Sequence, residues 1–104
     1  MIRQFDVCAN PGSSTASDAP LICVLQSHYL EGMDTVMVAP MIRGQAQATA
    51  TQVAVPTIFD GESYLLDLAL MASLERRHLQ KAVGSLLDSE YDIRRALDRL
   101  FTGF

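Results

Sequence analysis

The sequence contains no tryptophan, only two cysteines and only eight lysine or arginine residues in 104. The net charge is −4, and outside residues 90–101 the one adjacent basic pair is Arg76-Arg77. Proteins that bind DNA or RNA through its phosphates need a basic stripe or patch, which this pattern does not provide. We therefore expect no direct binding of nucleic acid by the chain alone.

The scarcity of cysteine argues against a metal site. Cys8 and Cys23 lie in apolar runs, without a C-x-x-C spacing and with too few histidine neighbours for zinc. Disulfides are typical of secreted chains, and Met1–Asp6 lacks the apolar segment of a secretory signal. We expect reduced thiols in the core, no bound metal and a cytoplasmic protein.

Long apolar runs are also missing. The longest, Tyr64 to Leu74, is interrupted by Asp67 and is shorter than the roughly 20 residues that a membrane-spanning helix needs. We expect no membrane association.

Catalytic motifs are missing as well. Ser13 and Ser14 lack the G-x-S-x-G setting of a nucleophile, and His28 and His78 have no carboxylate partner that the sequence predicts. No glycine pattern matches a phosphate loop or a dinucleotide fingerprint. The sequence predicts a binding protein without a cofactor rather than an enzyme, and both histidines are interpreted as surface residues.

Three acidic residues, Asp60, Glu62 and Asp67, lie around one predicted turn. They could hold a metal or act as paired carboxylates. An Asp-Gly turn already accounts for Asp60, so the turn interpretation is favoured.

What the chain does contain is enough apolar material for one core. Hydrophobic residues make up 49% of the sequence, and this length is typical of one domain, so we expect a single domain over residues 1–104. Short apolar or alternating runs predict strands at Phe5–Ala9, Leu21–Leu25 and Thr35–Ala39. We expect Asn10–Ala19 to be a loop, Glu31–Asp34 a turn, and Pro40 to end the third strand.

Asp60-Gly61 predicts a tight hairpin turn after a strand at Val53–Phe59. Alternating leucines favour a further strand from about Ser63 to about Ser73. The pattern leaves open the conformation of residues 43–52 and of residues 74–87.

The last segment predicts an amphipathic helix from Glu90 to Phe101. Ser89 and Asp92 resemble a capping box, and Gly103 stands where a left-handed residue ends a helix. At about 100° per residue, one apolar face should dock on the sheet and leave the tail as a surface for function. That face comprises Ile93, Ala96, Leu97, Leu100, Phe101 and Phe104, with Asp92, Arg95, Asp98 and Arg99 opposite.

Several segments, taken in order, resemble the CcdB family, the toxins of a type II toxin–antitoxin module. They are Gln26-Ser27, Thr35–Pro40, Gly61–Tyr64, Met71–Ser73 and, most specifically, Asp92–Phe104. The resemblance implies a mainly β fold with one C-terminal α-helix, an SH3-like antiparallel barrel, assembled as a homodimer. It also implies a non-enzymatic toxin that binds the DNA gyrase A subunit, inhibits the topoisomerase on cleaved DNA, and is neutralised by the flexible C-terminal tail of a cognate antitoxin.

By position, the resemblance assigns gyrase binding to the helix end, the tail and one loop. The residues are Tyr29, Leu30, Asp98, Phe101, Thr102, Gly103 and Phe104. The chain departs from the family at Thr102, where the family has tryptophan, a side chain that can bury about 150 to 250 Å² against a partner.

Two alternatives stay open. The first is a non-poisoning CcdB homologue that binds its antitoxin and, as a complex, represses transcription of its operon. The second is an RNA endonuclease, because ribonuclease toxins of the MazF kind share this barrel; Arg43 and His78 are the residues to test.

Overall fold

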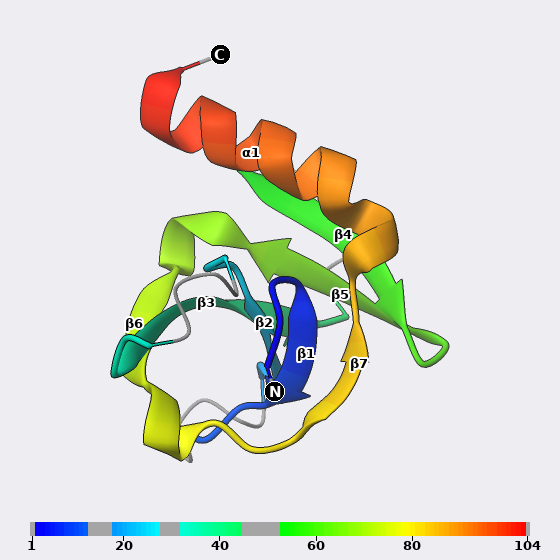
Figure 1. Ribbon diagram of the computed structural model, residues 1–104. Helices are drawn as coiled ribbons and strands as arrows, with labels where there is room; N and C mark the ends of the chain where they lie inside the picture. Colours follow the sequence, from blue (N-terminus) through cyan, green and yellow to red (C-terminus); the bar gives the residue numbers. More distant parts are fainter. Residues whose placement is uncertain (1, 13–17, 28–31, 45–52, 104) are drawn as a thin grey trace.

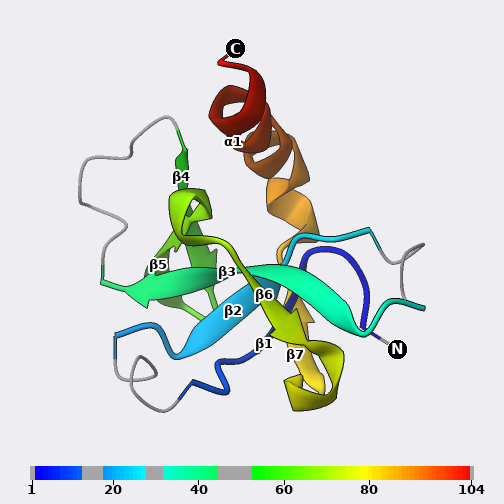
Figure 2. The ribbon, with the colours of Figure 1, turned by 90° about the vertical axis from the view of Figure 1, so that its left-hand side faces the viewer.

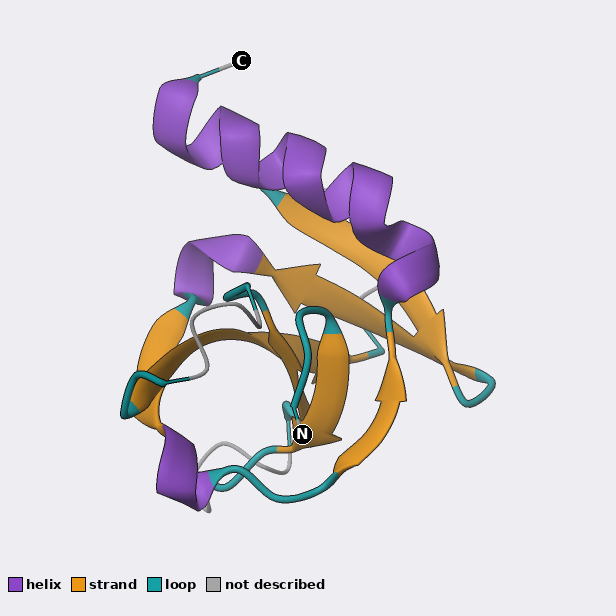
Figure 3. Ribbon diagram, in the orientation of Figure 1, coloured by secondary structure: helices purple, strands orange, loops and turns teal. Residues whose placement is uncertain are grey.

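An antiparallel sheet curls around most of the molecule, and one helix lies across its upper side (Figure 1). The computed structural model describes residues 2–12, 18–27, 32–44 and 53–103. In this part, the seven-stranded sheet has the order β4-β5-β3-β2-β1-β7, and β6 pairs with β3 as well. The expected class, mainly β with one C-terminal α-helix, is confirmed (Figure 3).

The strands lie close to the positions that the sequence predicts. Their bounds are β1 (Asp6–Ala9), β2 (Leu21–Val24), β3 (Thr35–Arg43), β4 (Ala54–Phe59), β5 (Glu62–Asp67), β6 (Ala72–Glu75) and β7 (Ala82–Ser85). β2 and β3 pair antiparallel, as the two neighbouring apolar runs indicate.

Buried side chains form two clusters on the two faces of the sheet. Cys23 belongs to the larger cluster, which includes Phe5, Met41 and Ile93, whereas Cys8 belongs to the smaller one with Ile22, Val24, Val36 and Val38. Both thiols are free and fully buried, as expected. Since they lie on opposite faces of adjacent strands, they are not placed to form a disulfide with each other.

Pro40 does not end its strand, so the prediction from the sequence that it would is wrong. The Leu25 amide donates to the Met37 carbonyl oxygen at 2.9 Å. In an antiparallel pair every second residue directs its main-chain groups to the same neighbour, so alternate residues counted from Met37 bond to β2. The main-chain groups of Pro40 therefore point away from β2. On that other side β6 pairs as far as Val38, and β5 pairs only from Met41 onward. Pro40 therefore lies where β3 changes partner, and its missing N–H interrupts no ladder.

The predicted strand from Ser63 to Ser73 is also wrong, because it is broken in the middle. A single 3-10 turn, η2 (Leu68–Leu70), separates β5 from β6, and the Asp67 carboxylate accepts a hydrogen bond from the Ala69 amide at 3.1 Å. The break moves the chain from one half of β3 to the other. The alternation of leucines did not reveal it, because η2 buries Leu68 in the same core.

The structure describes part of the two segments, residues 43–52 and 74–87, whose conformation the sequence does not predict. Residues 74–87 contain the end of β6, η3 (Arg76–His78), β7 and the start of η4 (Leu87–Ser89). Arg43 ends β3, and residues 45–52 lie outside the described part, as do residues 13–17 of the expected loop. No helix in the described ranges has the length and apolar character needed to cross a membrane.

The predicted hairpin between β4 and β5 is confirmed. Asp60 (φ 54°) and Gly61 (φ 79°) both adopt positive φ, and Phe59 pairs with Glu62 across the turn. Within the described residues, no group of three histidine, cysteine, aspartate or glutamate side chains gathers as a metal site. Asp60 serves the turn and Asp67 caps η2, which accounts for two of the three acidic residues.

Candidate functional site

The C-terminal helix α1 (Glu90–Thr102) is held to the barrel along its first three turns or so. Ile93 and Ala96 are buried, and Leu97 and Leu100 pack against the larger cluster from its border. The Arg94 guanidinium lies over the ring of Phe5, 5.4 Å from its centroid, which ties the helix to the start of β1. The helix ends one residue later than predicted.

The predicted capping box at the start of α1 is wrong. Ser89 makes no side-chain capping bond, because it belongs to the preceding η4 turn. Glu90 and Asp92 still place negative charge in the first turn, where it favours the helix dipole. Glu90 also accepts a hydrogen bond from Arg94 at 2.7 Å, one turn further on.

Phe101 does not belong to the docked face, in contrast to the sequence interpretation. At about 100° per residue it lies roughly 80° from Ile93, at the edge of the apolar face. By that point the helix extends beyond the sheet (Figures 1 and 2), and Phe101 is 71% exposed. An aromatic side chain is thus presented to solvent at the end of a rigid element.

The helix end itself is well defined. Gly103 adopts φ 80°, and its amide donates to the Arg99 carbonyl oxygen at 3.0 Å, which confirms the predicted left-handed end. The Thr102 hydroxyl donates to the Asp98 carbonyl oxygen at 2.6 Å. The Gly103 bond satisfies a carbonyl group that a helix terminus otherwise leaves to water, and the Thr102 bond ties the threonine side chain back to the last turn.

We call Asp98, Phe101, Thr102 and Gly103 the helix tip. All four are exposed, and the Asp98 carboxylate has no ion-pair partner in the described part of the chain. These are four of the seven residues that the sequence assigns to a binding surface. The other three, Tyr29, Leu30 and Phe104, lie outside the described residues, so the structure does not place them beside the tip.

A second aromatic side chain on the helix was not singled out from the sequence. Tyr91 is 68% exposed, and its hydroxyl accepts a hydrogen bond from Arg95 at 3.2 Å. The Arg95 guanidinium also lies 5.5 Å from the ring centroid. Tyr91 is on the first turn of the helix, so it provides a comparison for Phe101 on the last.

Sequence reasoning also missed a polar cluster at the far end of β3. Arg43 Nη1 lies 3.9 Å from Glu62 Oε2, which accepts a hydrogen bond from the Tyr64 hydroxyl at 2.9 Å. Burial raises the pKa of Tyr64, and the hydrogen bond to Glu62 adds to that rise. The cluster depends on β3–β5 pairing, in which Arg43 is opposite Tyr64, and no sequence pattern indicates it.

His78 is exposed, as interpreted, but it does have a carboxylate neighbour. Its Nε2 lies 3.9 Å from Glu75 Oε2 across η3. His28 lies outside the described residues.

In the described part of the chain, the fold is a small curled antiparallel sheet, and helix α1 carries the exposed helix tip at its end. A model of the family described as CcdB protein matches residues 4–103. The chain therefore belongs to the CcdB family, and it is a toxin of a toxin–antitoxin module. The resemblance inferred from the sequence is confirmed.

A solved structure supports the same architecture. Mycobacterium tuberculosis toxin MazF-mt6 is similar with a TM-score of 0.70, over 95% of this chain and 96% of that chain. The sequence identity is 15%, so this likeness concerns the fold alone. No curated protein sequence matches the chain.

Proposed function

We propose that the protein is a gyrase-directed toxin that binds the DNA gyrase A subunit through its helix tip and tail and inhibits the enzyme on cleaved DNA. The observation that carries this proposal is the exposure of Phe101, 71%, at the projecting end of a helix whose other end is anchored in the core. Membership of the CcdB family gives the class of partner.

The tip has the features of an interface anchor. Aromatic side chains contribute much of the binding energy at protein interfaces when they enter a pocket of the partner. Here Phe101 is already presented on a rigid helix, so little conformational entropy is lost on binding. The unpaired Asp98 carboxylate is available for a basic group of the partner.

Thr102 sets the strength of this interaction. In place of the family tryptophan it offers a methyl group and a hydroxyl, and the hydroxyl is already bonded to the Asp98 carbonyl oxygen. We infer that Phe101, together with the tail, is the main apolar anchor, and that binding is weaker than a tryptophan would give.

We propose further that the toxin acts as a homodimer, without covalent chemistry, and that the flexible tail of a cognate antitoxin neutralises it. Trapping an enzyme on cleaved DNA needs binding in the right place, not a catalytic group. This fits a helix tip that carries one carboxylate and no nucleophile paired with a base.

The experiment is a gyrase assay with purified protein and two matched variants. Phe101→Ala and Tyr91→Ala each remove an exposed aromatic ring from α1, at opposite ends. We expect the wild type to block supercoiling and accumulate cleaved DNA, Phe101→Ala to lose at least about tenfold in potency, and Tyr91→Ala to keep it. Equal potency of all three proteins would contradict the proposal.

The non-poisoning homologue remains the nearest alternative, in which the protein binds its antitoxin and represses its operon as a complex. Normal growth on strong induction, with antitoxin binding intact, would select it.

One observation favours a second candidate function, RNA cleavage. The cluster of Arg43, Glu62 and Tyr64 places a carboxylate between a guanidinium and a hydroxyl. Such a carboxylate could take the proton of an RNA 2′-hydroxyl as that oxygen attacks the adjacent phosphorus, while Arg43 stabilises the phosphate charge and water protonates the departing 5′-oxygen. RNA cleavage that Glu62→Gln and Arg43→Gln abolish, and that His78→Gln leaves intact, would support this function over gyrase binding.

A further inference from the structure

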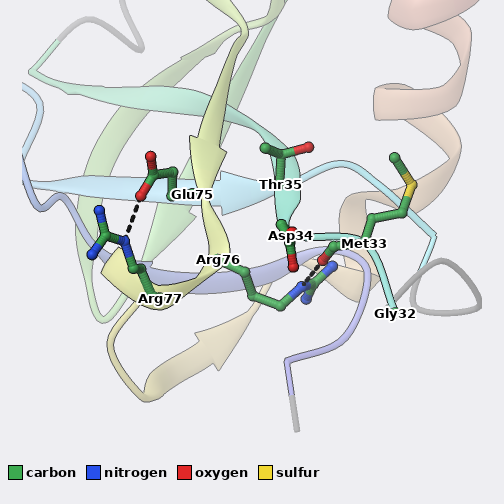
Figure 4. A pocket seen from close by; sticks show the side chains of 7 residues that line it. All are labelled: Gly32, Met33, Asp34, Thr35, Glu75, Arg76 and Arg77. Carbon is green, nitrogen blue, oxygen red and sulfur yellow. Dashed lines mark hydrogen bonds and ion pairs between the residues drawn. The ribbon is translucent and has the colours of Figure 1, made fainter.

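Arg76 and Arg94 each tie two separate segments of the fold together. At the end of the β3–β6 ladder, beside an open cavity, Arg76 Nε donates to the Met33 carbonyl oxygen at 2.9 Å (Figure 4). The Arg76 amide donates to the Asp34 carbonyl oxygen at 2.7 Å. These bonds join η3 to the turn before β3 and involve no residue of α1. Arg94, in contrast, joins α1 to the turn at residues 3–6.

The turn at residues 3–6, which leads into β1, contains a strained residue. The Asp6 amide donates to the Arg3 carbonyl oxygen at 3.1 Å, and the Arg3 amide donates to Asp6 Oδ2 at 2.8 Å. Phe5, inside this turn, adopts φ 69°. A positive φ is uncommon for residues other than glycine, and it is strained for a bulky side chain. Such strain persists only where the surrounding structure holds the residue in place.

Contacts from two other segments hold Phe5. Its amide donates to the Val24 carbonyl oxygen of β2 at 2.7 Å, and its carbonyl oxygen accepts a hydrogen bond from the Leu86 amide at 2.8 Å. The ring is 1% exposed and belongs to the larger cluster. Leu86 directly precedes η4, and α1 follows η4 without a gap. Phe5 is therefore fixed through both of its main-chain groups, one of which is bonded to the segment that leads into the helix.

The fixed ring supports α1 through Arg94. The guanidinium carbon Cζ lies 5.4 Å from the ring centroid, and Nε donates to Glu90 Oε2 at 2.7 Å one turn earlier in the helix. The cation thus contacts the barrel on one side and its own helix on the other. Arg94 and Phe101 are seven residues apart, so at about 100° per residue they lie on nearly the same side of α1, two turns from each other. A rotation or tilt of α1 that displaces Phe101 would therefore also displace Arg94 from the ring.

Arg95 makes the same kind of contact within the helix. Its guanidinium carbon lies 5.5 Å from the ring centroid of Tyr91, and its Nη1 donates to the Tyr91 hydroxyl at 3.2 Å. Because both residues belong to α1, this contact does not set the direction of the helix relative to the sheet. The two neighbouring arginines therefore separate the loss of a cation and its ring contact from the loss of a tie to the barrel.

We propose that Phe5 and Arg94 are positioning residues for the helix tip, which fix the direction in which α1 presents Phe101. The strained turn holds the ring of Phe5, and the ring holds Arg94. The direction of α1 does not depend on any partner. Its consequence for gyrase inhibition rests on the proposed function, because a rigid tip must enter its partner in one orientation.

The test is the direction of α1 relative to the sheet, measured from residual dipolar couplings of the main-chain amides in the full chain. We expect Arg94→Gln to change the couplings of α1, while those of β1, β2 and β3 stay as in the wild type. Arg95→Gln should leave both sets unchanged. Arg76→Gln should lower stability toward urea without changing the couplings of α1, which separates the direction of the helix from the stability of the fold.

A double-mutant cycle assigns the effect to the ring contact. Phe5→Leu keeps an apolar side chain in the turn but removes the face of the ring. Combining it with Arg94→Gln should add little to the change in α1 couplings that either variant causes alone. If Phe5→Leu does not fold, the comparison of Arg94→Gln with Arg95→Gln still decides.

Gyrase inhibition is measured on the same variants. Arg94→Gln should reduce potency about two- to fivefold, the range that a partly exposed cation–π contact allows, and Arg95→Gln should retain it. Wild-type couplings in Arg94→Gln, or an equal change in Arg95→Gln, would overturn the proposal. Changed couplings with undiminished inhibition by Arg94→Gln would overturn the link to the helix tip. A wild type that does not inhibit gyrase would contradict the proposed function instead, and the couplings would still decide what sets the direction of α1.

Discussion

The ring of Phe59, at the end of β4, lies directly over the Cα of Gly84 in β7. A Cβ on Gly84 would stand 2.5 Å from two ring carbons, Cε1 and Cζ. β4 and β7 are the two ends of the strand order, so this contact brings opposite edges of the sheet together. Gly84 is needed for close approach, not for an unusual backbone conformation.

Gly84→Ala should therefore destabilise the fold. Phe59 would have to leave its position, and forcing extra volume into a packed contact costs about 1 to 3 kcal/mol. Urea unfolding monitored by circular dichroism measures the change. In a double-mutant cycle, Phe59→Leu should remove part of the cost of Gly84→Ala; strictly additive effects would show that the ring is not the obstacle.

Thr102→Trp should strengthen gyrase inhibition. A buried aromatic anchor at an interface is often worth about 2 kcal/mol, which corresponds to roughly 30-fold in affinity. Induced toxicity and the supercoiling assay measure the effect. Thr102→Val is the control, because it removes the hydroxyl bond to Asp98 without adding a ring; if valine raises toxicity as much as tryptophan, the ring is not responsible.

Substitutions at Gly103 test whether gyrase inhibition depends on the direction in which the tail leaves the helix. Its φ of 80° is strained for residues with a Cβ, although no atom stands within 4 Å of one built there. Gly103→Ala should lower helix stability by about 1 kcal/mol and weaken gyrase inhibition. Gly103→Asn, which tolerates this conformation better, should keep more of both. A tail that needs no fixed direction would leave inhibition unchanged in the two variants.

The buried thiol of Cys23 should make the folded protein less stable at alkaline pH. Burial, followed by the charge of Asp6, raises the pKa of the thiol from 9.0 to about 12. Because the folded pKa lies above the unfolded one, its contribution to stability is complete below pH 9 and is lost as the pH rises toward 12. The slope should approach 1.4 kcal/mol per pH unit. Chemical unfolding between these pH values, compared with Cys23→Ala, measures it; a variant with the same slope would assign the loss to other groups.

Much of the fold could be predicted because the deciding interactions are local. Asp60-Gly61 specifies its turn through positive φ values, and Gly103 specifies the helix end in the same way. Ile93 and Ala96 identify the buried side of the helix from spacing alone. The family could be recognised from ordered segments that end in Asp92–Phe104.

Errors arose where a distant partner decides the local structure. Pro40 stays inside β3 because β5 and β6 meet opposite it, and the leucine run breaks at Asp67 for the same reason. Phe101 fits the apolar spacing of the helix, but no sheet lies beneath it.

By itself, then, the sequence determined the strand and helix periodicity, the left-handed turn positions and the family, since each depends on neighbours along the chain. Only the tertiary structure decided that Phe101 faces solvent, that Arg43 meets Glu62, and that the main-chain oxygen of Met33 fixes Arg76 in a cavity. Those relationships join residues 19 to 43 positions apart or depend on where the sheet ends, and neither pairing nor burial can be read from spacing.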